Sequence, residues 1–324
     1  DGFRFDLMGV HDIGTMNEVR RALDRIDPSI LLYGEGWTAA RSPLDESLRA
    51  VKRAGPRLPR IAVFDDDLRD ALRGGWGDST EPGFVSGKSG LDRNVRFGVV
   101  GATAHFQVGF DSSGDSPVAY GGHSAETINY VSCHDDLSLV DKLRASAPEG
   151  MTEEELVRFD KLAQTVVLTA QGIPSLFAGE EMLRTKGGVS NSHDSPDRVN
   201  RIDWSFKADH KDVFDYYRGL IALRRTHPAF RLATAAEIER HLRFLDTGDT
   251  HVVAYMLVDH AGDDPWREIL VVYNGARAEK RVRIPPGDWH AVCLDGRIAS
   301  EALAVFSGDS VPVPASSALI AYLP

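Results

Sequence analysis

Short apolar runs alternate with helical patterns along most of this 324-residue chain. We expect strands over residues 1–9, 30–33, 60–64, 127–132 and 175–178. Helical patterns separate them over residues 15–26, 43–53, 95–106, 152–171 and 210–226, the first opened by a capping box at Thr15 and Glu18. Strands and helices that alternate in this way form a parallel sheet with helices outside it. The pattern therefore predicts an α/β fold, either a barrel or an open doubly wound sheet.

The pattern changes at about residue 234, where short strands with alternating apolar residues begin. These strands are expected over residues 241–245, 251–258, 268–273, 281–284 and 317–323, with turn sequences such as TGDT and PPGDW between them. This part is predicted to be an all-β antiparallel sandwich. We therefore expect two domains, residues 1–233 and residues 234–324, which suits a chain of this length.

Composition excludes several classes of function. The net charge is -11, with 37 Lys and Arg against 48 Asp and Glu, which disfavours binding to a phosphate backbone. The two cysteines, Cys133 and Cys293, cannot build a disulfide framework, and neither belongs to a CxxC pair. No apolar run reaches the length of a membrane span. We therefore expect a globular protein with neither a nucleic-acid nor a membrane partner, in a compartment that the sequence leaves open.

Acidic residues stand at the ends of three predicted strands. Asp6 ends the first, Glu35 follows the second, and Asp135 follows the strand over residues 127–132. The carboxyl ends of parallel strands are where catalytic groups converge in α/β proteins. Like charges brought together destabilise a fold unless their pKa values separate, so that one group acts as an acid and another as a nucleophile. The pattern predicts a catalytic site built from carboxylates.

The first strand also pairs an arginine with one of these acids. Side chains alternate along a strand, so Arg4 and Asp6 share one face while Phe3 and Phe5 share the other. An arginine beside a carboxylate keeps it ionised, as a nucleophilic aspartate requires. The alternative is an ion pair with a structural role only.

Two other acidic patterns are weaker. His-Asp dipeptides at residues 11–12, 134–135 and 193–194 suggest a metallohydrolase, but no HxH or HxxE spacing accompanies them, and we predict no catalytic metal. Structural calcium remains compatible with the chain, although no EF-hand loop is present. The acidic run over residues 65–67 could line a cleft, but we interpret it as a helix N-terminus.

Six ordered motifs connect these residues to a known family. DGFRFDLMG, LLYGEGW and INYVSCHDD resemble signature regions of the α-amylase superfamily of retaining glycoside hydrolases, in the versions found in type I pullulanases. GIPSLFAGEE, LRTKGG and NSHDSPDRVNRIDW follow in the order of that family. The resemblance covers residues 1–228 and extends to the family's C-terminal β-sandwich. It implies a (β/α)8 barrel enzyme that cleaves α-1,6-glucosidic branch linkages in pullulan, glycogen or branched dextrins.

The resemblance also implies a role for each acidic residue. Asp6 would be the nucleophile, Glu35 the general acid and base, and Asp135 the carboxylate that binds sugar hydroxyls in the transition state. Arg4 would orient Asp6, and His134 would hydrogen-bond the same glucosyl ring. A retaining mechanism requires a raised pKa for Glu35 and a separation of about 5 Å between the two reacting carboxyl groups. It requires no cofactor.

Four further residues are candidate sugar contacts. Trp37 could offer its ring to a sugar, but a tryptophan at this position could equally pack in the core. Asp197, Asn200 and Arg201 match sugar-contacting positions of the family, yet they follow an ordinary turn sequence. We retain all four as predicted substrate-binding residues.

The chain departs from the family in two respects. Gly9-Val10 replaces the Lys-His of the amylases, which favours the pullulanase branch. Only five barrel strands are predicted, whereas the family places its nucleophile on the fourth of eight, and a partial barrel leaves open edges. We therefore expect the missing N-terminal part of the enzyme as a partner and leave open whether the chain alone is active. The alternative is a fragment that binds glucan without hydrolysing it.

Overall fold

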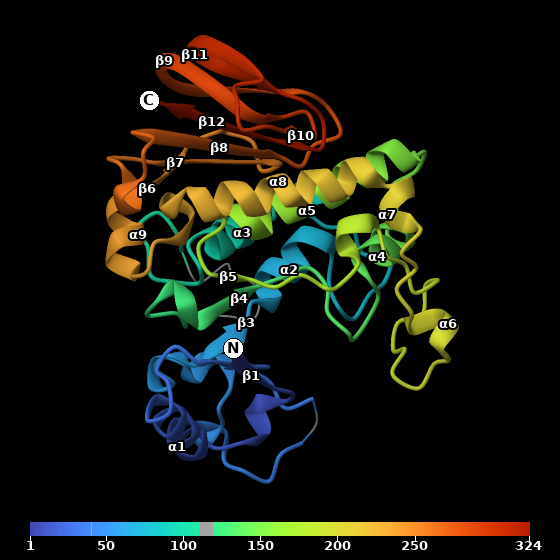
Figure 1. The fold of residues 1–324 in the computed structure, drawn as a ribbon, viewed down its shortest axis with the longest axis vertical. Coiled ribbons are helices and arrows are strands. Elements are labelled where there is room, and N and C mark those ends of the chain that lie inside the picture. Colours follow the sequence, from blue (N-terminus) through green and yellow to red (C-terminus); the bar gives the residue numbers. More distant parts are fainter. Residues whose placement is uncertain (40, 110–118) are drawn as a thin grey trace.

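The computed structural model of the protein describes residues 1–39, 41–109 and 119–324 (Figure 1). Its first part contains a parallel sheet whose five strands lie in chain order: β1 (Gly2–Phe5), β2 (Leu31–Gly34), β3 (Ala62–Phe64), β4 (Thr127–Asn129) and β5 (Ile173–Pro174). The predicted parallel sheet is thus confirmed. Within the described residues β1 and β5 are its edges, and no pairing between them closes a barrel.

The last strand of this sheet begins earlier than the sequence predicts. Residues 175–178 were the expected strand, but β5 ends at Pro174, and the Ser175 N–H makes the adjoining bond to the Asn129 carbonyl (2.8 Å). Proline has no N–H to donate and is tolerated at a sheet edge. The apolar residues after it therefore belong to a loop.

Helices of very different length surround the sheet. They are α1 (Ile13–Asp24), α2 (Asp66–Arg73), α3 (Asp92–Val99), α4 (Leu139–Ala145), α5 (Glu153–Thr169), α6 (Asp197–Asn200), α7 (Phe206–Asp209), α8 (Lys211–Thr226) and α9 (Ala235–His241). The predicted capping box of α5 is confirmed, because the Thr152 hydroxyl accepts the Glu155 N–H and the Glu155 carboxylate accepts the Thr152 N–H. Across the described ranges, no helix is both long and apolar enough to pass through a bilayer.

Three helix predictions differ from the structure. The helix expected over residues 95–106 is α3, which ends at Val99. The first helix is capped by Asp12, whose carboxylate accepts the Thr15 N–H (2.8 Å), so α1 starts at Ile13 and not at the predicted Thr15–Glu18 capping box. No α-helix forms over residues 43–53, where the chain makes short 3₁₀ turns at Glu46–Leu48 and Lys52–Arg57. The second turn contains Pro56, which cannot donate a helical hydrogen bond.

The C-terminal part is all-β and antiparallel, as predicted for the sandwich domain, and its strands are connected in a single sheet. Its strands are β6 (Leu242–Leu245), β7 (Val252–Leu257), β8 (Glu268–Asn274), β9 (Lys280–Leu294), β10 (Arg297–Ile298), β11 (Ala304–Val313) and β12 (Ser317–Leu323). Their order is β10-β9-β12-β8-β7-β6, and β11 pairs with β9. The sequence did not predict β11 and predicted only residues 281–284 of β9, because Pro285-Pro286-Gly287 resembles a turn although it lies within the strand.

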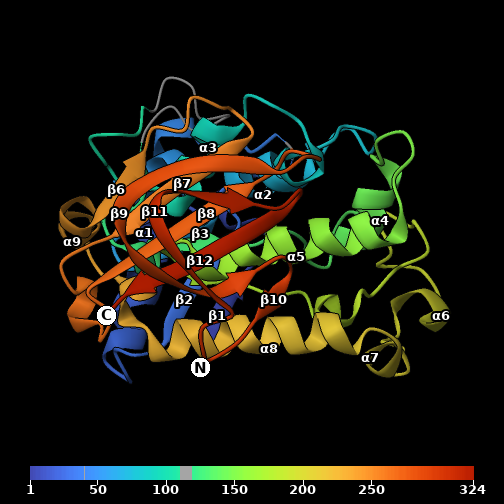
Figure 2. The ribbon, with the colours of Figure 1, turned by 90° about the horizontal axis from the view of Figure 1, so that it is seen from above.

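The central strands of this sheet are buried on both faces. Along β7, Val253, Tyr255 and Leu257 belong to the core shared with the helices, while Val252 and Met256 belong to a second core with β9 and β11. Figures 1 and 2 show the helical side, where α5 and α8 lie between the two sheets. The β-sheet is therefore fixed to the helical layer that supports the parallel sheet.

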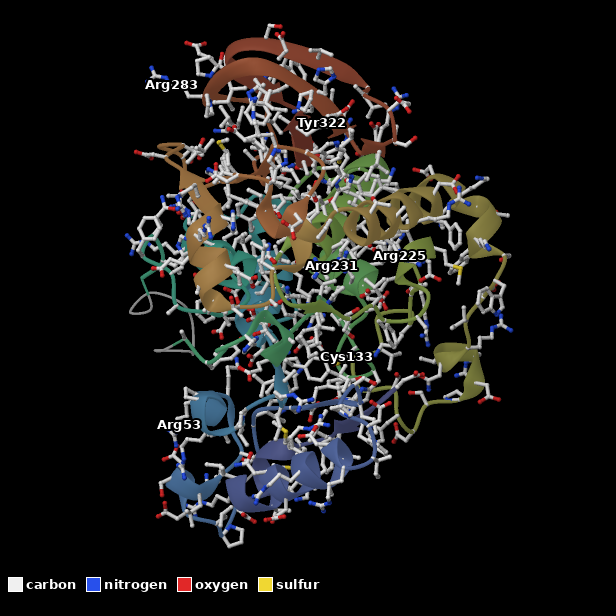
Figure 3. All side chains as sticks on the ribbon, turned by 60° about the vertical axis from the view of Figure 1, so that its left-hand side comes forward. Arg53, Cys133, Arg225, Arg231, Arg283 and Tyr322 are labelled. Carbon is white, nitrogen blue, oxygen red and sulfur yellow. The ribbon has the colours of Figure 1, made fainter. Side chains whose placement is uncertain are left out.

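Two neighbouring valines of β8 test this two-sided burial. Val271 belongs to the core shared with the helices and Val272 to the second core, and both are fully buried. Replacing either with alanine should lower the free energy of unfolding by about 2 kcal/mol, since each change removes buried methyl groups. Urea unfolding measures this. Arg283→Ala on exposed β9 surface (Figure 3) is the control, with an expected change within about 0.5 kcal/mol. A neutral result at either valine would contradict two-sided burial.

Candidate active site

The parallel sheet brings the three predicted acids together at the carboxyl ends of its strands. Asp6 and Glu35 come directly after β1 and β2, and Asp135 lies in the loop after β4. A cleft of about 700 Å³ opens at the carboxyl ends of the strands, and both Glu35 and Asp135 line it. Because all the strands are parallel, residues that follow them lie on the same side of the sheet.

One arginine joins two of the carboxyl groups. Arg4 donates from Nη1 to Oδ1 of Asp6 (2.5 Å) and from Nη2 to Oε1 of Glu35 (2.7 Å). The planar guanidinium presents both donors in a fixed geometry. Asp6 and Glu35, which lie on different strands, are therefore held on the same cation.

The two carboxyl groups have opposite environments. Glu35 is only 3% exposed, and its second oxygen accepts the Leu7 N–H (2.6 Å). The Asp6 side chain is 61% exposed. Burial raises the pKa of Glu35, as the sequence predicted, against the opposing effects of the Leu7 N–H and the Arg4 charge. One acid is thus buried with a raised pKa, while its neighbour faces solvent and a cation.

His134 lies between Asp6 and Asp135. Its Nε2 is 3.7 Å from Oδ1 of Asp6 and 3.5 Å from Oδ2 of Asp135. About half of each of the His134 and Asp135 side chains is exposed. The structure therefore gathers the five residues predicted to surround the reacting sugar: Arg4, Asp6, Glu35, His134 and Asp135.

Aromatic side chains form much of the cleft wall. Trp37 lines the cleft and also packs against a small buried cluster that includes Phe64 and Tyr130, so its position allows either of the roles considered for it. Cys133, which is labelled in Figure 3, is part of the same wall. Rings beside carboxylates suit a ligand with apolar faces and many hydroxyl groups.

The sequence did not predict the wall formed by α2 and the segment after it. Arg69, Asp70 and Arg73 of α2 and the 57% exposed Trp76 line the cleft. The acidic run over residues 65–67 was the available signal, and its interpretation as a helix N-terminus is confirmed, since Asp65 accepts the Leu68 N–H (3.0 Å). The alternative, that the run lines a cleft, also holds for Asp66, the first residue of α2. Nothing in the sequence indicated that the rest of this helix would face the cleft.

The predicted contacts on α6 lie elsewhere. Asp197, Asn200 and Arg201 do not line the 700 Å³ cleft. The Asn200 amide donates to the carbonyls of Ser192 (2.6 Å) and Ser195 (3.3 Å), which closes its own loop. Arg201 lines a separate pocket of about 370 Å³. These three residues are not brought together with the carboxylates.

The His-Asp dipeptides do not form a common cluster. Asp12 caps α1, and the His11 ring meets the Phe5 ring edge to face at 5.6 Å. Among residues 1–39, 41–109 and 119–324, no three His, Cys, Asp or Glu side chains are grouped as a metal site requires.

A buried glutamate, Glu180, joins segments that surround the site. Glu180 accepts hydrogen bonds from the Ser132 hydroxyl, from Nε2 of Gln164 (3.0 Å) and from the Phe177 N–H (3.2 Å). It thereby connects the loop after β4 with α5 and with the loop after β5. Burial raises the pKa of Glu180 to about 7.

Comparisons with known proteins agree on one family. The pullulanase all-beta domain matches residues 238–297. The pullulanase of Bacillus subtilis (strain 168) is 36% identical over 285 residues, covering 88% of this chain and 38% of the relative. The solved pullulanase from Bacillus acidopullulyticus is 40% identical with a TM-score of 0.91, covering 99% of this chain and 38% of that one.

A second solved structure gives the same result. The pullulanase from Paenibacillus barengoltzii, in complex with maltohexaose and alpha-cyclodextrin, is 42% identical with a TM-score of 0.87. It covers 100% of this chain and 48% of that chain. The present chain thus spans less than half the length of the relatives it matches.

Glu180→Gln tests the buried carboxyl. Because the folded-state pKa lies above the ordinary 4.5, the folded protein holds a proton that the unfolded chain releases, and stability falls as pH rises from about 4.5 to about 7. Glutamine keeps the shape and cannot ionise. We expect its stability relative to the original protein to rise by at least about 1.4 kcal/mol, the value of one pKa unit, between pH 5 and pH 8 in urea unfolding. Glu301→Gln, on the exposed surface, is the control, and identical pH dependence in all three proteins would contradict the prediction.

Proposed function

Because the chain belongs to the pullulanases of the α-amylase superfamily and corresponds to their C-terminal portion, we propose that it supplies the catalytic carboxylates of a debranching glycoside hydrolase. The proposed reaction is cleavage of α-1,6-glucosidic branch linkages in pullulan, glycogen or branched dextrins. The observation that carries the proposal is that Arg4 holds both Asp6 and Glu35, of which Glu35 lines the cleft and is buried while Asp6 is exposed.

The contrast in burial supports the two chemical roles that we propose. Glu35, whose pKa is raised by burial, donates a proton to the departing glycosidic oxygen while Asp6 attacks the anomeric carbon. Once the leaving group has gone, Glu35 is ionised and takes a proton from the water that hydrolyses the glycosyl-enzyme. Arg4 contacts both groups and stabilises their negative charges in turn.

The remaining groups bind the sugar. Asp135 accepts hydrogen bonds from ring hydroxyls as charge develops at the anomeric carbon, and His134 donates to the same ring. Trp37 and Trp76 offer apolar ring surface along the cleft. Glucan oligosaccharides as ligands are supported by the maltotriose and maltotetraose bound in two mutant pullulanases from Paenibacillus barengoltzii. None of these steps requires a metal, and calcium would have only a structural role.

The barrel is proposed to be completed by an upstream part of the same enzyme. β1 is an edge of the described sheet, and Phe3 on it is 54% exposed. Ile26, at the end of the neighbouring helix, is 77% exposed. Unpaired strand edges and exposed apolar side chains are sites where further chain packs. The additional strands would pair at this edge and form the eight-stranded barrel.

Comparing the chain alone with the chain joined to its upstream segment separates hydrolysis from binding. We expect the joined form to release reducing ends from pullulan. Activity of the chain alone would show that five strands hold the carboxylates well enough for catalysis. If the joined form binds maltotetraose in calorimetry but releases no reducing ends, the protein is a glucan-binding module and the proposed activity is wrong.

Glu35→Gln tests the general acid. The amide keeps the size of the carboxyl group but has no acidic proton to transfer, so turnover of pullulan should fall by at least about 10²-fold, while maltotetraose affinity measured by calorimetry stays within about threefold. Glu18→Gln, in an exposed ion pair on α1, is the control and should have unchanged turnover. Activity that survived the Glu35 change would remove this residue from its role.

The stereochemistry of the first product tests the role of Asp6. A covalent intermediate on Asp6 requires two inversions, so the new reducing end should appear first as the α-anomer in proton NMR spectra recorded during hydrolysis. Asp6→Ala should abolish this reaction. First appearance of the β-anomer would show that water attacks directly and that Asp6 is not a nucleophile.

A further inference from the structure

The loop that carries His134 and Asp135 has little backbone support of its own. In the parts of the chain that the structure describes, no hydrogen bond between backbone groups involves residues 131–137. Asp136 within this loop has a left-handed backbone (φ 57°), a conformation that few residues other than glycine adopt and that aspartate tolerates better than most. Side chains from elsewhere must therefore hold the loop in place.

Lys186 contacts two backbone carbonyls of this loop. It belongs to the LRTKGG motif, is 2% exposed, and donates from Nζ to the carbonyls of His134 (3.2 Å), Asp136 and Ser190 (2.9 Å). A charged ammonium has three N–H groups, and each has one acceptor here. The neutral amine has only two N–H groups, so this arrangement requires the charged form.

The position of the two loop carbonyls is specific. The His134 carbonyl belongs to the peptide bond that precedes Asp135. The Asp136 carbonyl belongs to the residue that follows Asp135. Fixing both sides of Asp135 restricts its φ and ψ angles and hence the direction of its side chain. Asp135 lines the cleft, while Lys186 does not.

Lys186 is itself held firmly. Its backbone N–H donates to Oδ2 of Asp141 (2.7 Å) in the first turn of α4. On the other side of the loop, Arg73 of α2 donates to Oδ2 of Asp136 (2.7 Å) and to the Leu137 carbonyl (3.0 Å). The loop thus lies between two buried cations, Lys186 and Arg73. The Lys186 ammonium group donates only to backbone carbonyls.

We propose that Lys186 is a positioning residue for catalysis, whose ammonium group aims the Asp135 carboxylate at the sugar by holding the backbone carbonyls on both sides of it. This inference rests on the proposed function, because it assumes that Asp135 contacts the sugar. Lys186 touches no substrate in this role. A contact that tightens in the transition state loses its value when its carboxylate is misplaced by about 1 Å, which can cost about 10²-fold in rate.

The test compares Lys186→Met with Lys161→Met in the form of the enzyme that hydrolyses pullulan. Lys161 is also buried, and it donates to the Gly296 carbonyl (3.2 Å) and to Asp212 (3.0 Å), away from the cleft. We expect Lys186→Met to lower kcat about 100-fold with KM within about threefold. Lys161→Met should lower Tm and leave kcat unchanged. Equal kcat in Lys186→Met and the original enzyme would overturn the proposal.

Hydrogen exchange gives a second result that does not depend on activity. Amide exchange over residues 131–138 should become faster in Lys186→Met and not in Lys161→Met. Unchanged exchange would show that Lys186 does not hold this loop and would overturn the proposal. If the original enzyme does not hydrolyse pullulan, the proposed function fails, and exchange still decides whether Lys186 holds the loop.

Chemical rescue separates hydrogen bonding from packing. Lys186→Ala leaves room for propylammonium, which replaces the missing methylene groups and the three N–H donors. We expect added propylammonium to restore at least about tenfold of the lost kcat, the scale of one charged hydrogen bond. Tetramethylammonium, which has no N–H group, should restore none. Equal restoration by both ions, or by neither, would overturn the positioning role.

Discussion

The contact of one guanidinium with two carboxyl groups is the interaction on which the site depends. Arg4 lies within β1 and reaches both Asp6 at the end of its own strand and Glu35 at the end of the next. Without a shared cation, these two acids would repel each other at the same edge of the sheet. The pairing of β1 with β2 sets the geometry of this contact. The parallel register of these strands therefore determines whether Arg4 can reach both carboxyl groups.

Burial then distinguishes groups that are chemically alike. Glu35 is covered by the loop after β1, whereas Asp6 and Asp135 are half exposed or more, and the pKa of Glu35 rises as a result. Behind this surface, no hydrogen bond between backbone groups involves residues 131–137 in the part of the chain that the structure describes. The buried side chains of Lys186 and Glu180 contact this loop instead.

Sequence patterns predicted the elements whose signal is local. The parallel strands, the capped helix α5 and most strands of the C-terminal sheet follow from periodicity and capping residues. The errors arose where one local signal competed with another. Asp12 precedes a capping box that looked better, and Pro285-Pro286-Gly287 resembles a turn inside the strand β9. Pro174, expected to lead into a strand, instead ends one.

The sequence by itself determined which acids end the strands, since Asp6, Glu35 and Asp135 stand in recognisable motifs after apolar runs. Only the tertiary structure decided what surrounds them. It turned α2 towards the cleft, kept the residues of α6 away from it, and brought Lys186 to the carbonyls of a loop about fifty residues earlier. The physical reason is that a side chain bonded to a distant backbone carbonyl leaves no periodicity or spacing in the sequence.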